Sequence, residues 1–361
     1  MNAKLSLALA AALTLTFAGC SETDNNQVAD TAPETPTETV MTTEPVESNP
    51  FFEESPLYMH YPQFDKIESA HYVPAFELGM EQQLAEIDAI TNQAEPPTLD
   101  NTLIPMQRSG QLLNRAGRVF FAMTSANTND ELESIRSDMA PKFSAHRDKI
   151  RLNGKLFARI QTLYEQRDSL ELDPESYRLI EETYKDFVRA GALLSDEEKE
   201  KLKAMNAELA SLQTKFSQNV LKEVNASAVV VDSRDELAGM PETKIEAAAE
   251  AANAEEMEGK YLIALLNTSQ QPPLADLEDR ALRQRIMEAS LARGSRGGEF
   301  DNREILTRVV KIRAERAQLL GYPNHAAYGL ENQTARTTQA VNERLASLAP
   351  PAVANAKREA A

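Results

Sequence analysis

The chain has 361 residues, of which 38 are Lys or Arg and 56 are Asp or Glu, so its formal net charge at pH 7 is −18. This negative balance argues against nucleic acid as a partner, because proteins bind phosphates through Lys and Arg, and against adsorption to anionic lipid by charge. With 13 glycines, no Trp and 6% aromatic residues, the composition disfavours a β-sandwich or barrel, and the length favours about two domains.

The chain begins with a segment that resembles a bacterial lipoprotein signal. Lys4 precedes the mostly apolar run 5–17, which is shorter than the roughly 20 residues of a membrane-spanning helix. Cys20, the single cysteine, follows two small residues at the cleavage position of a lipobox. We therefore expect residues 1–19 to be removed and Cys20 to carry the lipid that anchors the protein to a membrane. The alternative is an ordinary secretory signal with an incidental cysteine.

Residues 20–48 have the composition of a disordered acidic tether. The stretch 21–48 holds seven acidic residues, seven Thr and three Pro, and it contains no Lys or Arg. Such a segment buries too little apolar surface to offset its chain entropy. Ser21 after the cysteine resembles lipoproteins that are sorted to the outer membrane. The sequence therefore predicts a lipid-anchored, periplasm-facing protein of the bacterial cell envelope.

From residue 49 onward, apolar residues recur every three or four positions, which predicts a helical domain over 49–225. Pro141 is expected to end the helix that begins at Asp130, since proline interrupts the backbone hydrogen bonds of a helix. Asp173 followed by Pro174 predicts an N-cap and a first helical residue. The helices expected in this domain cover residues 74–91, 101–120, 130–140, 174–187 and 196–220.

The longest of these helices has the clearest sequence signals. Ser195 and Glu198 form a capping box before it, and its apolar residues from Leu202 to Val220 step by three or four. Helices of this length pack on one another as hairpins, so we expect the first domain to be an antiparallel helical array.

The second region, 226–361, contains the convincing strand signals of the chain. Strands are expected at 228–231 and 261–266, and helices at 242–257, 282–291 and 302–320. Gly321 follows the last helix as a C-cap residue. We therefore expect an all-α chain with one or two short strands.

The sequence offers no recognisable metal site in this span. The histidines are His60, His71, His146 and His325, and none is part of the H-E-x-x-H pattern of zinc helices. A cysteine-based zinc finger and a disulfide framework are both excluded, because Cys20 is alone. Scattered structural or surface roles are therefore expected for all four histidines.

Phosphate and nucleophile motifs are equally absent from the sequence. The Gly-rich loop 293–298 lacks the G-K-[ST] of a P-loop, so a flexible connection between helices is expected there, with an anion contact through Arg293 or Arg296 as the alternative. No G-x-S-x-G pattern occurs. The adjacent carboxylate pairs 181–182 and 255–256 should point into solvent, because neighbouring residues on a helix face different directions.

One long stretch resembles the thimet oligopeptidase family of zinc metallopeptidases. Residues 302–322 are similar to that family's pattern N-x-x-I…L-R-x-E-x-A-x-L-L-G-Y, with Ile312 at the Leu position. Residues 345–350 continue the resemblance. Other stretches resemble the bacterial peptidyl-dipeptidase (Dcp) branch of the family in the same order along the chain. They are residues 49–52, 55–57, 64–67, 172–175, 236–241 and 267–272.

The resemblance implies a fold and a reaction. Members of this family are almost wholly helical and enclose a narrow channel, with one zinc ion held by the two His of H-E-x-x-H and a downstream Glu. The Dcp branch releases C-terminal dipeptides from short peptides. By this resemblance we expect residues 49–225 to form the amino-terminal wall of the channel and residues 226–361 to begin the catalytic region. The catalytic and zinc-binding residues would then lie beyond Ala361, with none in this span.

A different class of function is the alternative. The chain would then be a non-enzymatic helical lipoprotein that acts as a binding module or scaffold. The two hypotheses differ in one observable, which is whether an H-E-x-x-H motif is encoded after codon 361. Short peptides are the partners expected from the first hypothesis, and both hypotheses share the membrane anchor at Cys20.

Overall fold

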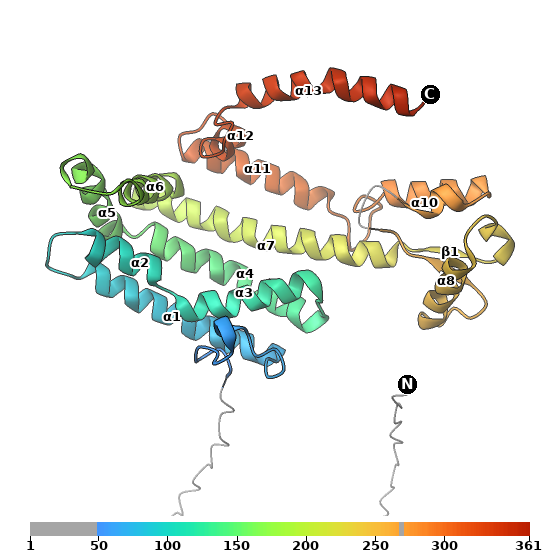
Figure 1. Ribbon diagram of the computed structural model, residues 1–361, viewed down its shortest axis with the longest axis horizontal. Coiled ribbons are helices and arrows are strands. Elements are labelled where there is room, and N and C mark those ends of the chain that lie inside the picture. The colour runs from blue at the N-terminus through green and yellow to red at the C-terminus, as the bar shows by residue number, and fades with distance from the viewer. Residues whose placement is uncertain (1–48, 267–270) are drawn as a thin grey trace, which may run out of the picture. The chain divides into compact units, whose positions relative to one another are not determined.

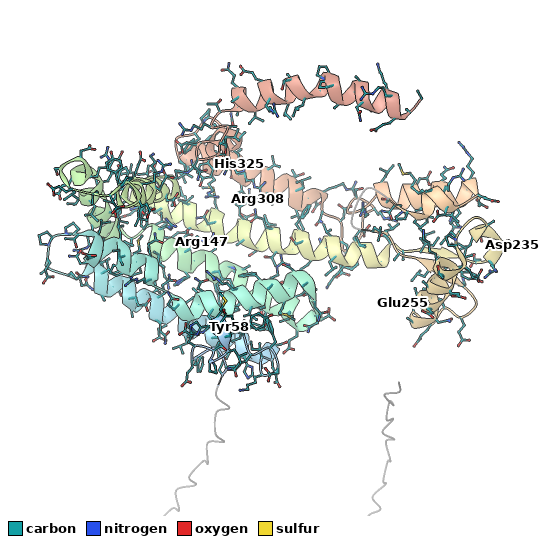
Figure 2. All side chains as sticks on the ribbon, in the orientation of Figure 1. Tyr58, Arg147, Asp235, Glu255, Arg308 and His325 are labelled. Carbon is teal, nitrogen blue, oxygen red and sulfur yellow. The ribbon has the colours of Figure 1, made fainter. Side chains whose placement is uncertain are left out.

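The computed structural model describes residues 49–266 and 271–361; Figure 1 shows their arrangement and Figure 2 adds the side chains. The predictions for residues 1–48, including the signal segment, Cys20 and the tether, lie outside the described residues. Within the described ranges helices predominate and two strands form one small sheet, which confirms the all-α expectation. Short turns of 3-10 or π-helix occur at Tyr58–His60, Ser69–His71, Leu99–Leu103, Arg167–Ser169 and Arg234–Leu237.

The first helices agree only partly with the sequence pattern. α1, Tyr72–Thr91, lies where it is expected. The single helix expected next is instead two, because α2 covers Ile104–Arg108 and α3 covers Gln111–Ala126. That prediction was wrong because Gly110 adopts φ +74 between them, a left-handed conformation that glycine adopts at little cost. The Gly110 N–H donates to Glu86 Oε2 at 2.7 Å, which ties this break to α1.

α4 covers Asp130–Arg151 and continues through Pro141, so the expected end of the helix at this proline was wrong. A proline in a helix interior costs about 3 kcal/mol. Packing of α4 along α7, Asp196–Ala226, offsets that cost. Met139 and Ser144, on either side of the proline, are both buried. Tertiary contact therefore outweighs the helix-breaking tendency of this proline.

Two helix starts in the first domain confirm the predicted caps. Asp173 Oδ1 accepts two backbone N–H groups, both at 2.9 Å, at the start of α6, Pro174–Ala190. The Ser195 N–H donates to Glu198 Oε2 at 2.9 Å, and the Glu198 N–H donates to Ser195 Oγ at 3.3 Å. One further helix, α5 at Gly154–Gln166, was not among the expected ones and packs on α6.

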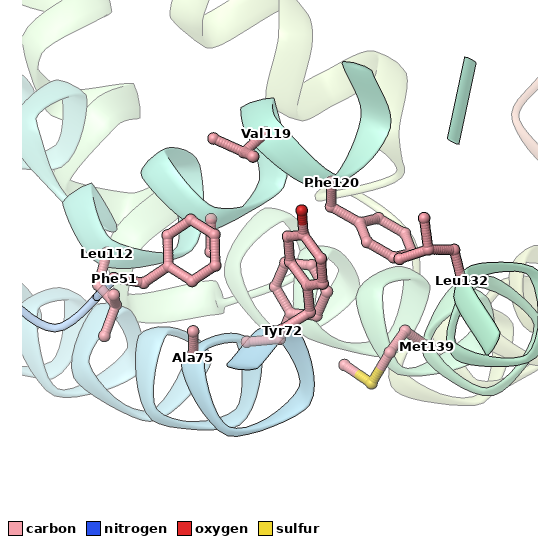
Figure 3. Close-up of a cluster of buried hydrophobic side chains, with 10 residues drawn as sticks. Phe51, Tyr72, Ala75, Leu112, Val119, Phe120, Leu132 and Met139 are labelled. Atoms are coloured by element: carbon pink, nitrogen blue, oxygen red, sulfur yellow. The ribbon is translucent and has the colours of Figure 1, made fainter. Parts of the chain in front are cut away.

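Two clusters of buried apolar side chains hold these helices together. The first joins α1, α3 and α4 (Figure 3), and two of its aromatic pairs meet edge to face. The ring centroids of Tyr72 and Phe120 are 5.0 Å apart, and those of Phe76 and Phe120 are 5.3 Å apart; this geometry is favourable for aromatic pairs. The second cluster joins α1, α5 and α6, and Ile87, Ile160 and Phe187 belong to it. The first domain thus has a continuous set of packed helices.

The region after α7 contains the sheet. β1, Val229–Val231, pairs antiparallel with β2, Tyr261–Ile263, so the expected strands are present but shorter. α8, Glu242–Ala254, contacts β2, and α9, Pro273–Asp276, and α10, Arg280–Leu291, follow it in the chain. Val231, Leu237, Ile263 and Ile286 belong to the buried core of this region. The division into domains at residue 226 stays a prediction.

α11, Arg303–Leu319, packs on α7. Its Ile312 is fully buried in a cluster that includes Leu209 of α7, as expected from the spacing of its apolar residues. Gly321 follows with φ +82, and the next N–H donates back to the Ala317 carbonyl at 2.8 Å. This hydrogen bond is typical of a glycine C-cap, so the predicted end of the helix is confirmed.

The last described helices are α12, His325–Leu330, and α13, Thr338–Glu359. No residue of α13 is buried by the rest of the described chain. Leu345, Leu348 and Val353 are 58%, 45% and 53% exposed. Across residues 49–266 and 271–361, no helix has both the length and the apolar character needed to cross a membrane.

Candidate functional site

The histidines of the described chain do not meet in one metal site. His60 lies near Glu54, with 3.7 Å between Nδ1 and Oε2, and His71 Nδ1 accepts the Glu68 N–H at 3.0 Å. His146 and His325 line two different cavities. In the described ranges, no group of three or more His, Cys, Asp or Glu could hold a metal ion. These residues do not fit a zinc site.

The arginines of the Gly-rich loop are bonded to the protein. Arg293 donates to the Ser290 carbonyl at 3.0 Å and to the Leu266 carbonyl at 2.6 Å. Arg296 donates to the carbonyl of Ala289 and pairs with the buried Glu223, with 2.9 Å between Nε and Oε1. Both guanidinium groups therefore hold the loop to its neighbours, which disfavours the alternative of an anion contact there.

One of the two adjacent carboxylate pairs does not simply point into solvent. Glu181 and Glu182 are half-buried and pair with Arg178 and Lys185 along α6. Hydrogen bonds from Lys185 and Arg178 lower the pKa of Glu181. Both carboxylates stay at the surface, where side chains three or four residues apart on a helix reach one another. Residues 255–256 are exposed, as expected.

A cavity of about 710 Å³ lies among α3, α4, α6, α7, α11 and α12 and is here called the arginine cavity. Its lining holds six arginines and two aspartates, so it is positive although the whole chain has a net charge of −18. Arg147 and His325, labelled in Figure 2, come from α4 and α12. The charged lining residues are Arg136, Arg147, Arg151, Arg189, Arg313, Arg316, Asp148 and Asp186.

Three of these arginines have acidic partners. Arg136 lies 3.6 Å from Glu133 on its own helix. Arg151 lies 3.9 Å from Asp186 and stands over the Phe187 ring, with 5.1 Å from Cζ to the centroid. Arg189 forms an ion pair with Glu331 and donates to the Tyr328 carbonyl at 2.9 Å. These contacts join α6 to α4 and to the segment after α12. The other three arginines of the cavity, Arg147, Arg313 and Arg316, have no acidic partner among the described residues.

Those three have fewer contacts. Arg316 Nη2 donates to Tyr328 Oη at 3.2 Å, and its buried Nε has no hydrogen-bond partner among the described residues. Arg147 and Arg313 make no hydrogen bond and no ion pair with any residue that the structure describes. Arg147 is exposed on α4 and Arg313 is half-buried on α11. Two guanidinium groups of the cavity thus have their donors unused.

Asp148 is a buried acid on the wall of the arginine cavity. Its Oδ1 accepts Asn206 Nδ2 at 2.9 Å, and its Oδ2 has no partner within the described chain. Burial raises the pKa of Asp148, while the hydrogen bond from Asn206 and the charges of Arg147 and Arg316 oppose that rise. The cavity wall therefore has hydrogen-bonding capacity that the described residues do not satisfy.

A second cavity of about 440 Å³ adjoins the first and is here called the apolar cavity. The two share Phe121, Phe143, Arg147 and Arg151. Half of the remaining lining residues of the apolar cavity are hydrophobic, and they come from α1, α2, α3, α4 and α6. Ile87, Met106, Leu113, Gly117, Ile150 and Phe187 belong to it.

His146 is one of the polar residues that line the apolar cavity. Its Nε2 lies 2.7 Å from Gln83 Oε1, and Gln83 Nε2 donates to Ser109 Oγ at 3.1 Å. The Gln83 oxygen must therefore accept, which places the histidine proton on Nε2. Burial, followed by the charges of Lys149 and Arg147, lowers the pKa of His146. The ring is neutral at pH 7, and its buried Nδ1 has no partner among the residues described.

Sequence reasoning identified neither cavity. Arg147 and Arg313 lie on helices far apart in the chain, and each is surrounded by an ordinary amphipathic pattern. His146 and His325 were noted only as histidines. A local signal could have been sought in the cluster of basic residues at 147, 149 and 151 on α4, but solvated basic clusters on helices are common.

Comparison with known proteins shows which proteins this chain resembles. Residues 274–361 match the family model described as Peptidase family M3. The chain is 42% identical over 313 residues to dipeptidyl carboxypeptidase of Escherichia coli (strain K12), a match that covers 87% of this chain and 46% of that protein. Its identity to dipeptidyl carboxypeptidase of Salmonella typhimurium (strain LT2) is 42% over 305 residues, covering 84% and 45%.

More distant relatives carry a different name. Oligopeptidase A of Escherichia coli (strain K12) is 27% identical over 304 residues, which cover 83% of this chain and 45% of that protein. The chain therefore spans about half the length of the curated relatives that it matches. These similarities confirm the family resemblance read from the sequence, including its closeness to the dipeptidyl carboxypeptidase branch.

Proposed function

Because this chain is related to the peptidases of family M3 over most of its length, we propose that it is the amino-terminal portion of a zinc-dependent oligopeptidase. The reaction is the release of C-terminal dipeptides from short peptides. One observation carries the proposal, namely the 42% identity over 313 residues with dipeptidyl carboxypeptidase of Escherichia coli. Identity at this level over such a length supports a shared fold and a shared reaction class.

In the proposed enzyme the zinc ion is bound by residues other than those described here. When bound, the metal polarises the scissile carbonyl and activates a water molecule as nucleophile. The described residues contribute something else. α4 and α11 both pack on α7, and the helical array presents the arginine cavity and the apolar cavity. In the proposed enzyme this helical array is one wall of the channel and excludes folded proteins from the reacting centre.

The proposed enzyme is held to a bacterial membrane by lipid on Cys20. The support is the order of an apolar run, two small residues, the single cysteine and an acidic stretch. A single acyl chain binds membranes only marginally, so stable attachment requires more than one chain. Residues 20–48 then act as a tether between the membrane and the folded helices, with the helices on the periplasmic side of the outer membrane.

The enzymatic proposal is tested on the product of the complete gene. The coding sequence after codon 361 should contain H-E-x-x-H, and the purified product should release dipeptides from the C-terminus of short peptides, detected by mass spectrometry. A chelator should abolish the release, and zinc should restore it. If no such motif is encoded and no peptide is cleaved, the proposal is wrong and the non-enzymatic lipoprotein is the better reading.

The anchor has a separate test. In cells that process lipoproteins, the wild-type protein should fractionate with membranes and begin at Cys20. The variant Cys20→Ala should lack lipid and lose this fractionation. A wild-type protein that remains soluble, or whose mature chain begins at another residue, would contradict the lipoprotein proposal without affecting the enzymatic one.

A further inference from the structure

We propose that the arginine cavity and the apolar cavity together form one binding site for a peptide, with a carboxylate beside Arg147 and Arg313 and a neighbouring apolar side chain in the apolar cavity. The inference rests on the proposed function only for the class of ligand, which is a short peptide. It adds the residues of this chain that would bind such a peptide and the group of the peptide that each cavity would take.

The charge of the arginine cavity indicates an anion. Its lining holds six arginines against two aspartates, in a chain whose net charge is −18. Arg147 and Arg313 have no hydrogen bond and no ion pair within the part of the chain that the structure describes. Guanidinium groups bind carboxylates through paired N–H donors. The two unused groups come from α4 and α11, so one anion between them would join two helices.

The aspartates of the same lining favour a singly charged anion. Asp148 is buried, and the charges of Arg147 and Arg316 act on it. Asp186 lies 3.9 Å from Arg151. Part of the positive charge is thus offset before any ligand binds, which disfavours a doubly charged phosphate relative to a carboxylate. The unsatisfied Oδ2 of Asp148 and Nε of Arg316 show that this wall retains hydrogen-bonding capacity.

The apolar cavity lies where a side chain next to that carboxylate would enter. Arg147 and Arg151 line both cavities, as do Phe121 and Phe143. A peptide whose carboxylate contacts Arg147 therefore has an apolar surface within reach of an adjacent residue. His146 is neutral at pH 7, because burial lowers its pKa, so this ring adds no charge to the apolar cavity. Its unpartnered, buried Nδ1 is a second polar group that the described chain leaves unsatisfied.

Two pairs of variants separate the compartments. Arg147→Gln and Arg313→Gln remove the unused charges, and Arg344→Gln on the exposed surface of α13 is the matched control. For the apolar cavity, a Cβ on Gly117 would meet no atom within 4 Å, so Gly117→Leu fills the space without backbone strain. Gly154→Leu is its control, because a Cβ there is equally unhindered and Gly154 lines neither cavity.

Isothermal titration calorimetry of the full 361-residue chain measures binding of four peptides. These are N-acetyl-Ala-Ala-Phe with a free carboxylate, its C-terminal amide, the amide of N-acetyl-Glu-Ala-Phe, and N-acetyl-Ala-Ala-Ala with a free carboxylate. The free acid ending in Phe should bind at least about tenfold more tightly than its amide, since hydrogen bonds to charged groups are stronger than those to neutral groups. The glutamyl amide shows whether a side-chain carboxylate serves as well as a terminal one; tight binding of either supports the site.

The variants give the decisive comparison. Arg147→Gln and Arg313→Gln should each weaken binding of the acid about tenfold and leave the amide unchanged, whereas Arg344→Gln should change neither. Gly117→Leu should remove the preference for Phe over Ala at the C-terminus, and Gly154→Leu should keep it. Thermal melting monitored by circular dichroism confirms that each variant is folded.

Some results would overturn the inference. They are equal binding of the acid and both amides, an unchanged affinity in both cavity arginine variants, or no binding of any peptide. The test is independent of the proposed function, because this binding needs no cleavage. A complete gene product that cleaves no peptide contradicts the peptidase proposal. The peptide affinities measured on this chain still show whether the peptide-binding site exists.

Discussion

The helical array from α1 to α7 and the helix α13 differ in what they bury. In the array, Phe76, Phe120, Ile160 and Leu202 are fully buried, and each core cluster takes side chains from several helices. α13 is as long as α4 but has no buried residue within the described chain. The two regions are therefore helical for different reasons.

Local signals account for α13, whereas packing accounts for the array. Thr337 Oγ1 accepts the Ala340 N–H at 3.1 Å as an N-cap, and Lys357 and Arg358 lie in the last turn, where positive charge is favourable. Leu345, Leu348 and Val353 form one apolar stripe by helical spacing, and all three are exposed. An exposed stripe of this kind indicates a contact surface. The comparison shows that helix content alone does not report how firmly a region is held.

Loss of a core ring should give the largest effect. Phe76 is fully buried, and its ring centroid lies 5.3 Å from that of Phe120 and 4.9 Å from that of Phe143. Phe76→Ala should lower the free energy of unfolding by about 3–5 kcal/mol. Leu345→Ala on α13 should change it by no more than about 0.5 kcal/mol. Urea denaturation measures both, and a comparable loss in the two variants would break the contrast between array and α13.

Substitution of the two glycine C-caps, Gly191 and Gly321, should give a smaller difference in stability. Gly191 after α6 has φ +100, and a Cβ there would lie 2.6 Å from Leu202 Cδ2. Gly321 after α11 has φ +82, and a Cβ there would meet no atom within 4 Å. Gly321→Ala should cost about 1 kcal/mol from the left-handed backbone alone. Gly191→Ala should cost about 2–4 kcal/mol, because crowding adds to the backbone strain. Equal losses of stability for the two variants in thermal melting would show that the Leu202 side chain moves aside at no cost.

Two carboxylates of the packed helices should respond to pH in opposite directions. Burial raises the pKa of Asp148 in the folded chain, so its contribution to stability falls as pH rises from its unfolded pKa, about 3.9, to the folded value. Arg308 Nε and Nη2 donate to the two Glu208 oxygens at 2.6 and 2.7 Å and lower the pKa of Glu208. Its contribution is present above the unfolded pKa, about 4.3, and is lost as pH falls through the folded value.

Single variants isolate these two small effects. Asp148→Asn should remove the loss of stability with rising pH, and Glu208→Gln should remove the loss with falling pH. The Glu208 effect should also shrink at high salt, because this pair is only half-buried. Urea midpoints across the acidic range measure both. If the two substitutions change the pH dependence of the urea midpoint in the same direction, the environment of Asp148 is not the one described.

Much of this fold was predictable because its signals are local. Asp173 with Pro174 and Ser195 with Glu198 mark helix starts in any context, and the structure has them as caps. The predictions at Pro141 and Gly110 were wrong for opposite reasons: a helix continues where an end was expected, and a helix breaks where none was expected. Packing against α7 carries α4 through a proline, and a left-handed glycine splits a regular apolar pattern.

The candidate site was not predictable from the same signals. Arg147 and Arg313 line the same cavity only because α4 and α11 both pack on α7. No spacing in the sequence indicates that arrangement. His146 stood in the sequence as one histidine among four, and its role depends on Gln83 and Ser109 from other elements. Family resemblance supports the reaction class proposed above, whereas the cavities and unused donors come from tertiary structure alone.

The contrast between array and α13 has one direct measurement, which is native-state hydrogen exchange followed residue by residue. Amides of α7 between Leu202 and Val220 should exchange slowly, at rates set by global unfolding, because their helix lies between α4 and α11. Amides of α13 between Leu345 and Val353 should exchange orders of magnitude faster, because no described residue covers them. Equally deep protection of the two segments would contradict the claim that packing holds the array while α13 relies on local signals.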